Sequence, residues 1–275
     1  MATLREKAEA LRKLHAGPRI LVLANAWDVA SARIVEEVGF PAIATSSAGV
    51  AFALGYPDGQ RISRAEMLDM VRRIAAAVKV PVSADVEAGY GTTPEAAGET
   101  ARGVVAAGAV GINLEDTGPD GNLLPVEAQS GRIRAARGAA EKEGVPIVIN
   151  ARTDAFAMHD LSSDRRVAEA VRRANAYLEA GGDCAFVPFV TDREAIARLA
   201  REIRGPVNVL AGPGAPPISE LERMGVRRVS TGGGLARAAY GRARRVALEL
   251  KERGTYEALS EGAVTYAEMQ SLLGA

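Results

Sequence analysis

Two carboxylates, Asp85 and Glu87, follow the apolar run 78–82, and a Gly-Tyr-Gly turn closes the segment at residues 89–91. Side chains alternate between the two faces of a strand, so this spacing predicts that Asp85 and Glu87 share one face. Two like charges about 4 Å apart repel by roughly 4 kcal/mol at an effective dielectric constant of about 20. A bound cation or a retained proton removes that repulsion. The pair therefore predicts a metal site.

Short runs rich in Val and Ile alternate with longer segments of helical spacing. The predicted strands are residues 19–24, 42–45, 81–86, 110–114, 146–151, 184–188, 206–210 and 228–230. Continuous apolar strands that alternate with helices indicate a parallel sheet covered by helices. Eight such units predict a (β/α)₈ TIM-type barrel that forms one domain over residues 1–275. An open, doubly wound sheet would place a glycine-rich fingerprint after its first strand, and residues 25–28 carry none.

Helix starts and the tail refine this prediction. Ser63 and Thr191 each begin a capping box, and Thr93 precedes a proline at a first helical position. Residues 254–275 carry enough apolar side chains to form a C-terminal helical extension that docks on the barrel or on another subunit.

The carboxyl ends of barrel strands carry the active-site groups. At those ends Glu115 follows the fourth predicted strand and Arg152 the fifth, beside Asp85 after the third. Oxygen ligands of this kind suit a hard cation, Mg²⁺ best, and the planar guanidinium of Arg152 suits a substrate carboxylate. Simpler interpretations stay open: Asp85 could cap its turn, Glu115 could begin an ordinary loop, and Arg152 could only pair with a neighbouring carboxylate.

Two loops of small residues could bind anions. The loop 46–49 after the second strand could present backbone N–H groups, although small residues also suit tight turns. The run 231–234, Thr-Gly-Gly-Gly, is similar to a phosphate cradle at an eighth strand, and a plain strand-to-helix turn fits equally well.

The composition excludes several classes of function. Lys and Arg (34) balance Asp and Glu (34), which gives no electrostatic reason to expect nucleic acid or an anionic membrane as partner. Cys184, the single cysteine, is expected as a buried thiol and fits a reducing cytoplasm. His15 is expected on the surface of an amino-terminal helix, and His159 on a solvated loop, so zinc, iron and a Ser–His–Asp triad have little support.

Six stretches together resemble the isocitrate lyase/phosphoenolpyruvate mutase superfamily. They are residues 25–33, 44–49, 55–59, 84–91, 110–116 and 150–154. The most specific are the Asp-x-Glu-x-Gly-Tyr-Gly that begins at Asp85 and the Leu-Glu-Asp that begins at Leu114. The resemblance covers the chain from about Ile20 to Tyr240.

The resemblance implies a magnesium enzyme of 2-oxo acids. It implies that Asp85 binds Mg²⁺, and that Asp58, Glu87 and Glu115 complete the shell, mostly through water. It also implies that the loop 46–49 holds the carboxylate of a 2-oxo acid, and that Arg152 contacts anionic groups of the substrate. Members of this family form tetramers in which the last barrel helix is exchanged between neighbours, so we expect a homotetramer.

One loop departs from the family pattern. Family lyases carry Lys-Lys-Cys-Gly after the fourth strand, and the mutase and hydrolase branch carries a lysine and an asparagine there. In this chain the loop 117–129 has neither cysteine nor lysine, and Asn122 is a poor match for that asparagine without its lysine.

We therefore expect a Mg²⁺-dependent lyase that breaks a C–C bond in a small 2-oxo or 2-hydroxy dicarboxylic acid. The reaction would pass through a metal-stabilised enolate, by decarboxylation or by retro-aldol or Claisen cleavage. The rivals are phosphonopyruvate-type C–P chemistry and a binder of 2-oxo acids without turnover. Arg152, Glu115 and Tyr90 are the expected catalytic residues. The expected substrate contacts are Trp27, Thr45, Ser46, Ser47, Ala48, Gly49, Asp85, Arg152 and Asn208.

Overall fold

Nine short parallel strands form a nearly closed barrel in the computed structural model, which describes residues 2–158 and 161–274. The strands are β1 (Leu21–Leu23), β2 (Asn25–Ala26), β3 (Ile43–Thr45), β4 (Val82–Asp85), β5 (Gly111–Glu115), β6 (Val148–Arg152), β7 (Cys184–Val187), β8 (Val207–Leu210) and β9 (Arg228–Ser230). The hydrogen-bonded order is β1-β9-β8-β7-β6-β5-β4-β3-β2, with every pair parallel. The predicted first strand, residues 19–24, contains β1, and β2 follows it after Ala24. These two strands stand at the two ends of that order. The TIM-type fold is confirmed, and the expectation for His159 lies outside the described residues.

Helices surround this barrel. They are α1 (Leu4–Ala16), α2 (Val29–Glu37), α3 (Ser47–Ala53), α4 (Arg64–Ala77), α5 (Pro94–Ala106), α6 (Val126–Lys142), the 3₁₀ turn η1 (Ala155–Ala157), α7 (Ser163–Glu179), α8 (Arg193–Glu202), α9 (Ile218–Arg223), α10 (Gly234–Arg253), α11 (Glu257–Ser260) and α12 (Tyr266–Leu273). Strand residues such as Ile112, Ile149 and Val209 are buried in the apolar layer between the barrel and these helices. No described helix has the length and hydropathy needed to cross a membrane.

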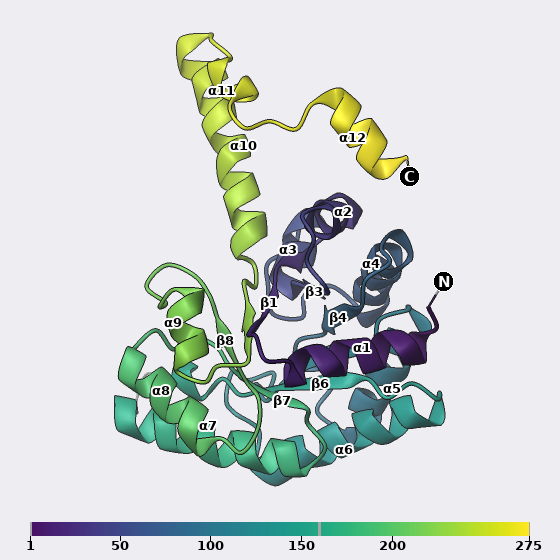
Figure 1. The fold of residues 1–275 in the computed structure, drawn as a ribbon, viewed down its shortest axis with the longest axis vertical. Coiled ribbons are helices and arrows are strands. Elements are labelled where there is room, and N and C mark those ends of the chain that lie inside the picture. The colour runs from purple at the N-terminus through teal and green to yellow at the C-terminus, as the bar shows by residue number, and fades with distance from the viewer. Residues whose placement is uncertain (1, 159–160, 275) are drawn as a thin grey trace.

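The C-terminal helices depart from the barrel layer. Figure 1 shows α10 extending away from the barrel and α12 returning toward α2. Arg33 in α2 donates from Nε to the carbonyl oxygen of Leu272 at 2.9 Å, and Leu272 is buried. The tail therefore packs on α2 of its own chain.

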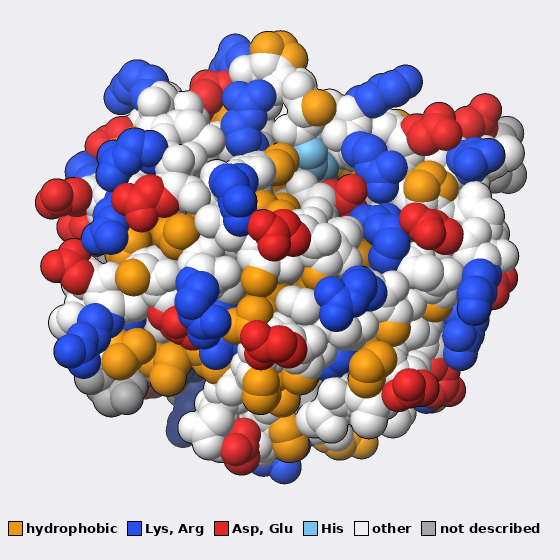
Figure 2. Space-filling model, turned by 90° about the horizontal axis from the view of Figure 1, so that it is seen from below, with side chains coloured by type: hydrophobic (Ala, Val, Ile, Leu, Met, Phe, Trp, Pro, Cys, Tyr) orange, Lys and Arg blue, Asp and Glu red, His pale blue; other side chains and the backbone are white. Residues whose placement is uncertain are grey.

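On the face shown in Figure 2, acidic and basic side chains are interspersed.

Two of the three predicted helix starts are confirmed. Ser63 caps α4 in a full capping box, and Thr93 caps α5 ahead of its proline. The third is wrong by one residue, because Asp192 rather than Thr191 caps α8 by accepting from the backbone N–H of Ala195 at 2.8 Å. Aspartate is as good a cap as threonine, and the pattern alone did not separate two adjacent candidates.

His15 is buried, so the expectation of a surface histidine was wrong. Its Nδ1 donates to the carbonyl oxygen of Leu11 at 2.8 Å, and its Nε2 lies 3.3 Å from Arg228 Nη1. Helix α1 lies against the amino-terminal ends of the strands, where Arg12 donates to the carbonyl oxygens of Pro146 and Ile147. His15 thereby reaches the floor of the barrel.

Replacing His15 with glutamine should remove part of the acid sensitivity of the fold. Burial, and next the charge of Arg228, lower the pKa of His15 from 6.5 to about 4. The hydrogen bond to the Leu11 carbonyl and the charge of Asp183 oppose this shift, and the charge of Arg12 adds to it. The unfolded chain therefore binds a proton between pH 6.5 and 4 that the folded chain does not. The stabilisation is complete above pH 6.5 and falls by about 2 kcal/mol between pH 7 and pH 5.

Urea unfolding of wild type and His15→Gln at pH 7 and pH 5 measures this difference. The exposed Lys13 on the same helix supplies a control, since Lys13→Gln should keep the wild-type pH dependence. An equal loss of stability in His15→Gln and wild type would contradict the prediction.

Candidate active site

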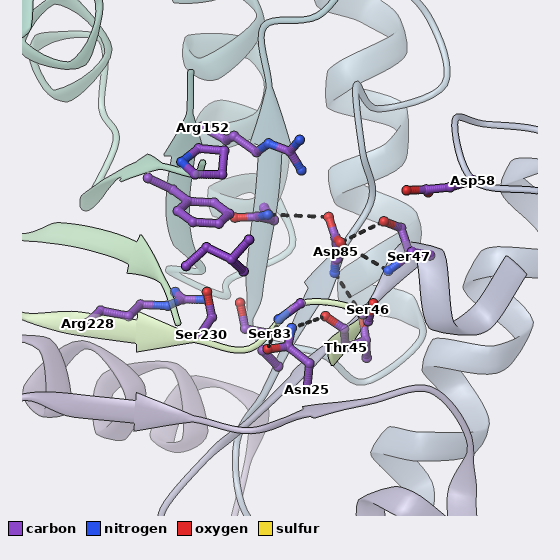
Figure 3. Close-up of a pocket in the computed structure, with 18 of the residues that line it drawn as sticks. Asn25, Thr45, Ser46, Ser47, Asp58, Ser83, Asp85, Arg152, Arg228 and Ser230 are labelled. Carbon is purple, nitrogen blue, oxygen red and sulfur yellow. Dashed lines mark hydrogen bonds between the residues drawn. The ribbon is translucent and has the colours of Figure 1, made fainter. Parts of the chain in front are cut away.

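A cavity of about 140 Å³ opens at the carboxyl ends of the strands and reaches into the barrel (Figure 3). Exposed Asp58 borders its mouth, and Arg228, only 2% exposed, borders its inner end. Pockets for drug-sized ligands measure about 300–1,000 Å³, so this cavity suits a molecule of few heavy atoms.

Asp85 is held rigidly in this cavity. Its Oδ2 accepts from the backbone N–H of Ser47 at 3.0 Å and from the Ser47 hydroxyl at 2.7 Å, as Figure 3 shows. Its Oδ1 accepts from Asn113 Nδ2 at 3.3 Å. Its backbone N–H donates to Thr45 Oγ1 at 2.9 Å. These contacts join β3, β4 and β5 and fix the orientation of the carboxylate.

The small-residue loop after β3 is the start of α3. Ser46 caps this helix by accepting from the backbone N–H of Gly49 at 3.1 Å. A Cβ at Gly49 would lie 2.7 Å from Trp27 Cβ, so only glycine fits there. Trp27 therefore packs behind the loop, and Ser46, Ser47 and Ala48 border the cavity.

Glu87 lies beyond the end of the strand, so strand alternation, on which the prediction for this pair rested, does not extend to it. Strand β4 ends at Asp85, and Glu87 has a left-handed backbone with φ of 51°. Its Oε2 accepts from the backbone N–H of Gln60 at 2.5 Å, and its buried Oε1 has no hydrogen-bond partner. Burial, and next the charges of Asp85 and Asp58, raise the pKa of Glu87 to about 7.

Arg152 is tied to two carboxylates. Its Nη1 lies 2.8 Å from Glu115 Oε2, and its Nε and Nη2 donate to the two oxygens of Asp154 at 2.6 and 3.0 Å. Phe186 and Phe189 flank the guanidinium at 5.8 and 5.7 Å from their ring centroids. Although burial opposes the charged form, Glu115 and Asp154 raise the pKa of Arg152, so it stays cationic. Burial raises the pKa of Glu115, and the charge of Arg152 works against that shift.

The cavity brings some of the predicted residues together and leaves others outside its wall. Those that border it are Thr45, Ser46, Ser47, Ala48, Asp58, Asp85 and Arg152. Those that do not are Trp27, Gly49, Glu87, Tyr90, Glu115 and Asn208. The hydroxyl of Tyr90 is buried without a hydrogen-bond partner, and burial raises its pKa far above 10. Asn208 bonds with Ser230 inside the barrel at 3.3 Å.

Sequence reasoning missed part of the wall. Ser83, Asn113, Phe186, Phe189 and Arg228 border the cavity, and none was among the predicted site residues. Ser83 and Asn113 stand two residues before Asp85 and Glu115 on their strands. Extending the two-residue alternation inward from each strand end would have found them, because strand residues two apart share a face.

Asn122 does not border this cavity. Its Nδ2 donates to Asp120 Oδ2 at 2.8 Å, and it borders a neighbouring cavity that shares Phe189 with the first. The loop is held by Thr117, whose hydroxyl donates to Asp154 Oδ2 at 2.7 Å. Helix α6 begins at Val126, so the last four residues of the segment 117–129 are helical.

The acidic side chains fit a cation that keeps most of its water. Over residues 2–158 and 161–274, no three His, Cys, Asp or Glu side chains converge closely enough to enclose a metal ion directly. Magnesium uses one or two protein carboxylates and retains several waters, so such a cage is not required. The unpartnered Oε1 of Glu87 and the repulsion among Asp58, Asp85 and Glu87 are the features that a nearby cation would satisfy.

The comparisons with known proteins agree with this architecture. Residues 11–251 match the family model described as phosphoenolpyruvate phosphomutase. A solved structure from Burkholderia cenocepacia J2315 is 38% identical with a TM-score of 0.91, and the match covers 99% of this chain and 97% of that chain. A phosphonopyruvate hydrolase solved with oxalate and Mg²⁺ is 26% identical with a TM-score of 0.84, over 98% and 95% of the two chains.

Two curated relatives carry names of lyase-type enzymes. An oxaloacetate decarboxylase of Rhodopseudomonas palustris (strain BisB18) is 34% identical over 237 residues, 82% of this chain and 78% of the relative. A 2-methylisocitrate lyase of Bacillus subtilis (strain 168) is 30% identical over 264 residues, 91% of this chain and 83% of the relative. With the family match over most of its length, the chain belongs to the phosphoenolpyruvate phosphomutase family, in the isocitrate lyase/phosphoenolpyruvate mutase superfamily of carbon–carbon lyases and mutases.

Proposed function

We propose that this protein is a Mg²⁺-dependent lyase that breaks a C–C bond in a small 2-oxo or 2-hydroxy dicarboxylic acid. The observation that carries the proposal is one 140 Å³ cavity bordered by Asp85, by the Ser46 loop and by Arg152. Its size favours a small acid over a drug-sized molecule. The names of the relatives, oxaloacetate decarboxylase and 2-methylisocitrate lyase, point to acids of that size.

Asp85 would hold the metal, with Asp58, Glu87 and Glu115 acting through water. Bound Mg²⁺ would supply positive charge beside the carbonyl and carboxylate oxygens of a 2-oxo acid and would stabilise an enolate. The oxalate and Mg²⁺ bound to the solved phosphonopyruvate hydrolase support this assignment.

The chain's own residues would orient the acid. The Ser46 oxygen accepts from Gly49, which leaves the Ser46 hydroxyl hydrogen to donate to a substrate carboxylate. Arg152 has used three N–H groups on Asp154 and Glu115, so two remain for an anionic group of the substrate. Tyr90, whose hydroxyl stays protonated beside Glu87, is the proton donor that we propose.

The glycine run after β9 speaks against phosphate chemistry. The backbone N–H groups of Thr231 and Gly232 both donate to Asn25 Oδ1, at 2.8 and 2.9 Å, and that of Gly234 donates to the Thr231 carbonyl at 3.0 Å. These bonds leave only the N–H of Gly233 in the run 231–234 without an intramolecular acceptor, and one N–H does not form a phosphate cradle. We therefore favour C–C cleavage over C–P chemistry.

We also propose that the protein works as a homotetramer that exchanges α10 between neighbours. Helix α10 projects from the barrel (Figure 1), and Tyr240, Leu248 and Leu250 on it are more than 40% exposed. Apolar side chains on a projecting helix need a partner surface. Sedimentation at micromolar concentration tests this, and a monomer would contradict it.

Incubation with a panel of acids tests the reaction. Purified protein with Mg²⁺ should convert at least one of oxaloacetate, 2-methylisocitrate or 2,3-dimethylmalate to C–C cleavage products, and EDTA should stop turnover. Phosphonopyruvate serves as the comparison substrate, because release of phosphate from it would overturn the assignment. Metal-dependent binding of the acids without any product would support a binding protein instead.

A further inference from the structure

Arg228 brings a buried positive charge to the inner end of the cavity. It opens β9 and pairs in register with Leu21 of β1 and Asn208 of β8, so its side chain belongs to the barrel interior. In Figure 3, Arg228 and Ser230 lie on the opposite side of the pocket from Asp58. With 2% of its surface exposed, Arg228 is among the most deeply buried large side chains.

Arg228 forms no ion pair with a carboxylate among the described residues, and the charge of Asp85 acts on it only from a distance. Its one hydrogen bond there joins Nη1 to the neutral ring of His15 at 3.3 Å, and its Nε has no partner. Arg152, at the other end of the same cavity, differs because Glu115 and Asp154 both neutralise it. An uncompensated buried charge is costly, since the protein interior solvates it poorly.

The surroundings of Arg228 are built from neutral polar groups. The buried hydroxyl oxygen of Ser83 borders the cavity and has no hydrogen-bond partner, and Ser230 borders it beside Arg228. The Ser230 hydroxyl is engaged with Asn208. The guanidinium of Arg228 and the Ser83 hydroxyl therefore offer the free donors, together with one unpaired positive charge. A small anion is the ligand that satisfies both the charge and the donors.

We propose that Arg228 and Ser83 form an anion-binding subsite at the inner end of the cavity, beside Ser230, which takes a group of the size and charge of a carboxylate or a halide. Two sources supply that chemistry: the second carboxylate of the substrate, or a resident inorganic anion such as chloride. The first source rests on the proposed function, because it requires the acid to be held at Asp85. It would make Arg228, rather than the neutralised Arg152, the residue that selects dicarboxylates.

Bromide tests the subsite independently of the metal. In EDTA, bromide should bind the full-length protein, and crystals soaked in bromide should show its anomalous signal beside Arg228. Arg228→Met should weaken bromide binding by at least about 10-fold, the usual effect of losing a charged hydrogen bond. Ser83→Ala, a milder change, should weaken it by about 3-fold to 10-fold and keeps the test open if Arg228→Met does not fold.

Asp85→Asn separates this subsite from the proposed function. That variant should lose Mg²⁺-dependent binding of oxalate and retain bromide binding. If Asp85→Asn kept its Mg²⁺-dependent binding of oxalate, the result would contradict the metal site and leave the anion subsite unaffected. Two results together would overturn the subsite. Crystals would show no bromide beside Arg228, and the bromide affinity would be the same in wild type, Arg228→Met and Ser83→Ala.

A pair of ligands distinguishes the two sources. With Mg²⁺ present, both carboxylates of oxalate would lie at the Asp85 end. 3,3-Difluorooxaloacetate would place one carboxylate and its carbonyl there and extend its second carboxylate away from that end. If the substrate supplies the anion, Arg228→Met should weaken binding of difluorooxaloacetate by about 10-fold to 100-fold and that of oxalate by less than about 3-fold. If a resident halide supplies the anion, Arg228→Met should lose bromide binding. Its affinities for difluorooxaloacetate and for oxalate should then each change by less than about 3-fold.

Discussion

Replacing Asp85 with asparagine should lower kcat/KM by about 10³-fold and abolish Mg²⁺-dependent binding of oxalate. The charge of a metal at the reacting oxygens contributes several kcal/mol to transition-state stabilisation, and 1.36 kcal/mol corresponds to tenfold in rate. Asparagine has nearly the same shape as aspartate and lacks the negative charge. Its single amide oxygen could accept from Ser47 or from Asn113, which now donate to the two oxygens of Asp85, but not from both.

Titration calorimetry with Mg²⁺ and oxalate, alongside turnover of whichever acid the panel identifies, measures this effect. Asp120→Asn is the matched control, because Asp120 is an exposed carboxylate on the nearby loop. It should leave both quantities within about 2-fold of wild type. Wild-type oxalate affinity in Asp85→Asn would remove Asp85 from the metal site and with it the proposed mechanism.

Local sequence patterns predicted the strands and most helix starts. Residues 228–230 were predicted as a strand and form β9, and Ser63 caps α4 as its capping box indicated. These features depend on neighbours within about four residues, through alternation, helical spacing and capping. The positions of Asp85 and Arg152 on the cavity wall followed from the barrel rule about strand ends.

Features that depend on contacts between distant segments were not predictable in the same way. Glu87 leaves the strand because its turn is held by Gln60, which is 27 residues away. His15 is buried because its ring meets Arg228, which is 213 residues away. Nothing in the local pattern of an amphipathic helix distinguishes a histidine that faces solvent from one that covers the floor of a barrel.

Replacing Arg132 with methionine should destabilise the fold by about 3–5 kcal/mol and weaken the metal site. Arg132, in α6, is fully buried. Its guanidinium donates to the carbonyl oxygens of Ala88 and Gly91 in the turn after β4 and to that of Glu115 at the end of β5. One side chain therefore holds together the two segments that carry Glu87 and Glu115. Methionine would leave those buried carbonyl oxygens without donors.

Urea unfolding and the Mg²⁺ concentration for half-maximal oxalate binding measure the two effects. Arg134→Met supplies the control, since Arg134 is exposed on the same helix and should change neither quantity appreciably. Arg132→Lys keeps the charge and reaches fewer carbonyl oxygens, so it should fold and still raise the Mg²⁺ requirement by about 10-fold, in the range found for groups that orient metal ligands. A destabilised Arg132→Lys protein with the wild-type Mg²⁺ requirement would show that Arg132 supports the fold and leaves the carboxylates unaffected. A raised requirement at nearly wild-type stability would show that the two loops must be held together for the carboxylates to act on one cation.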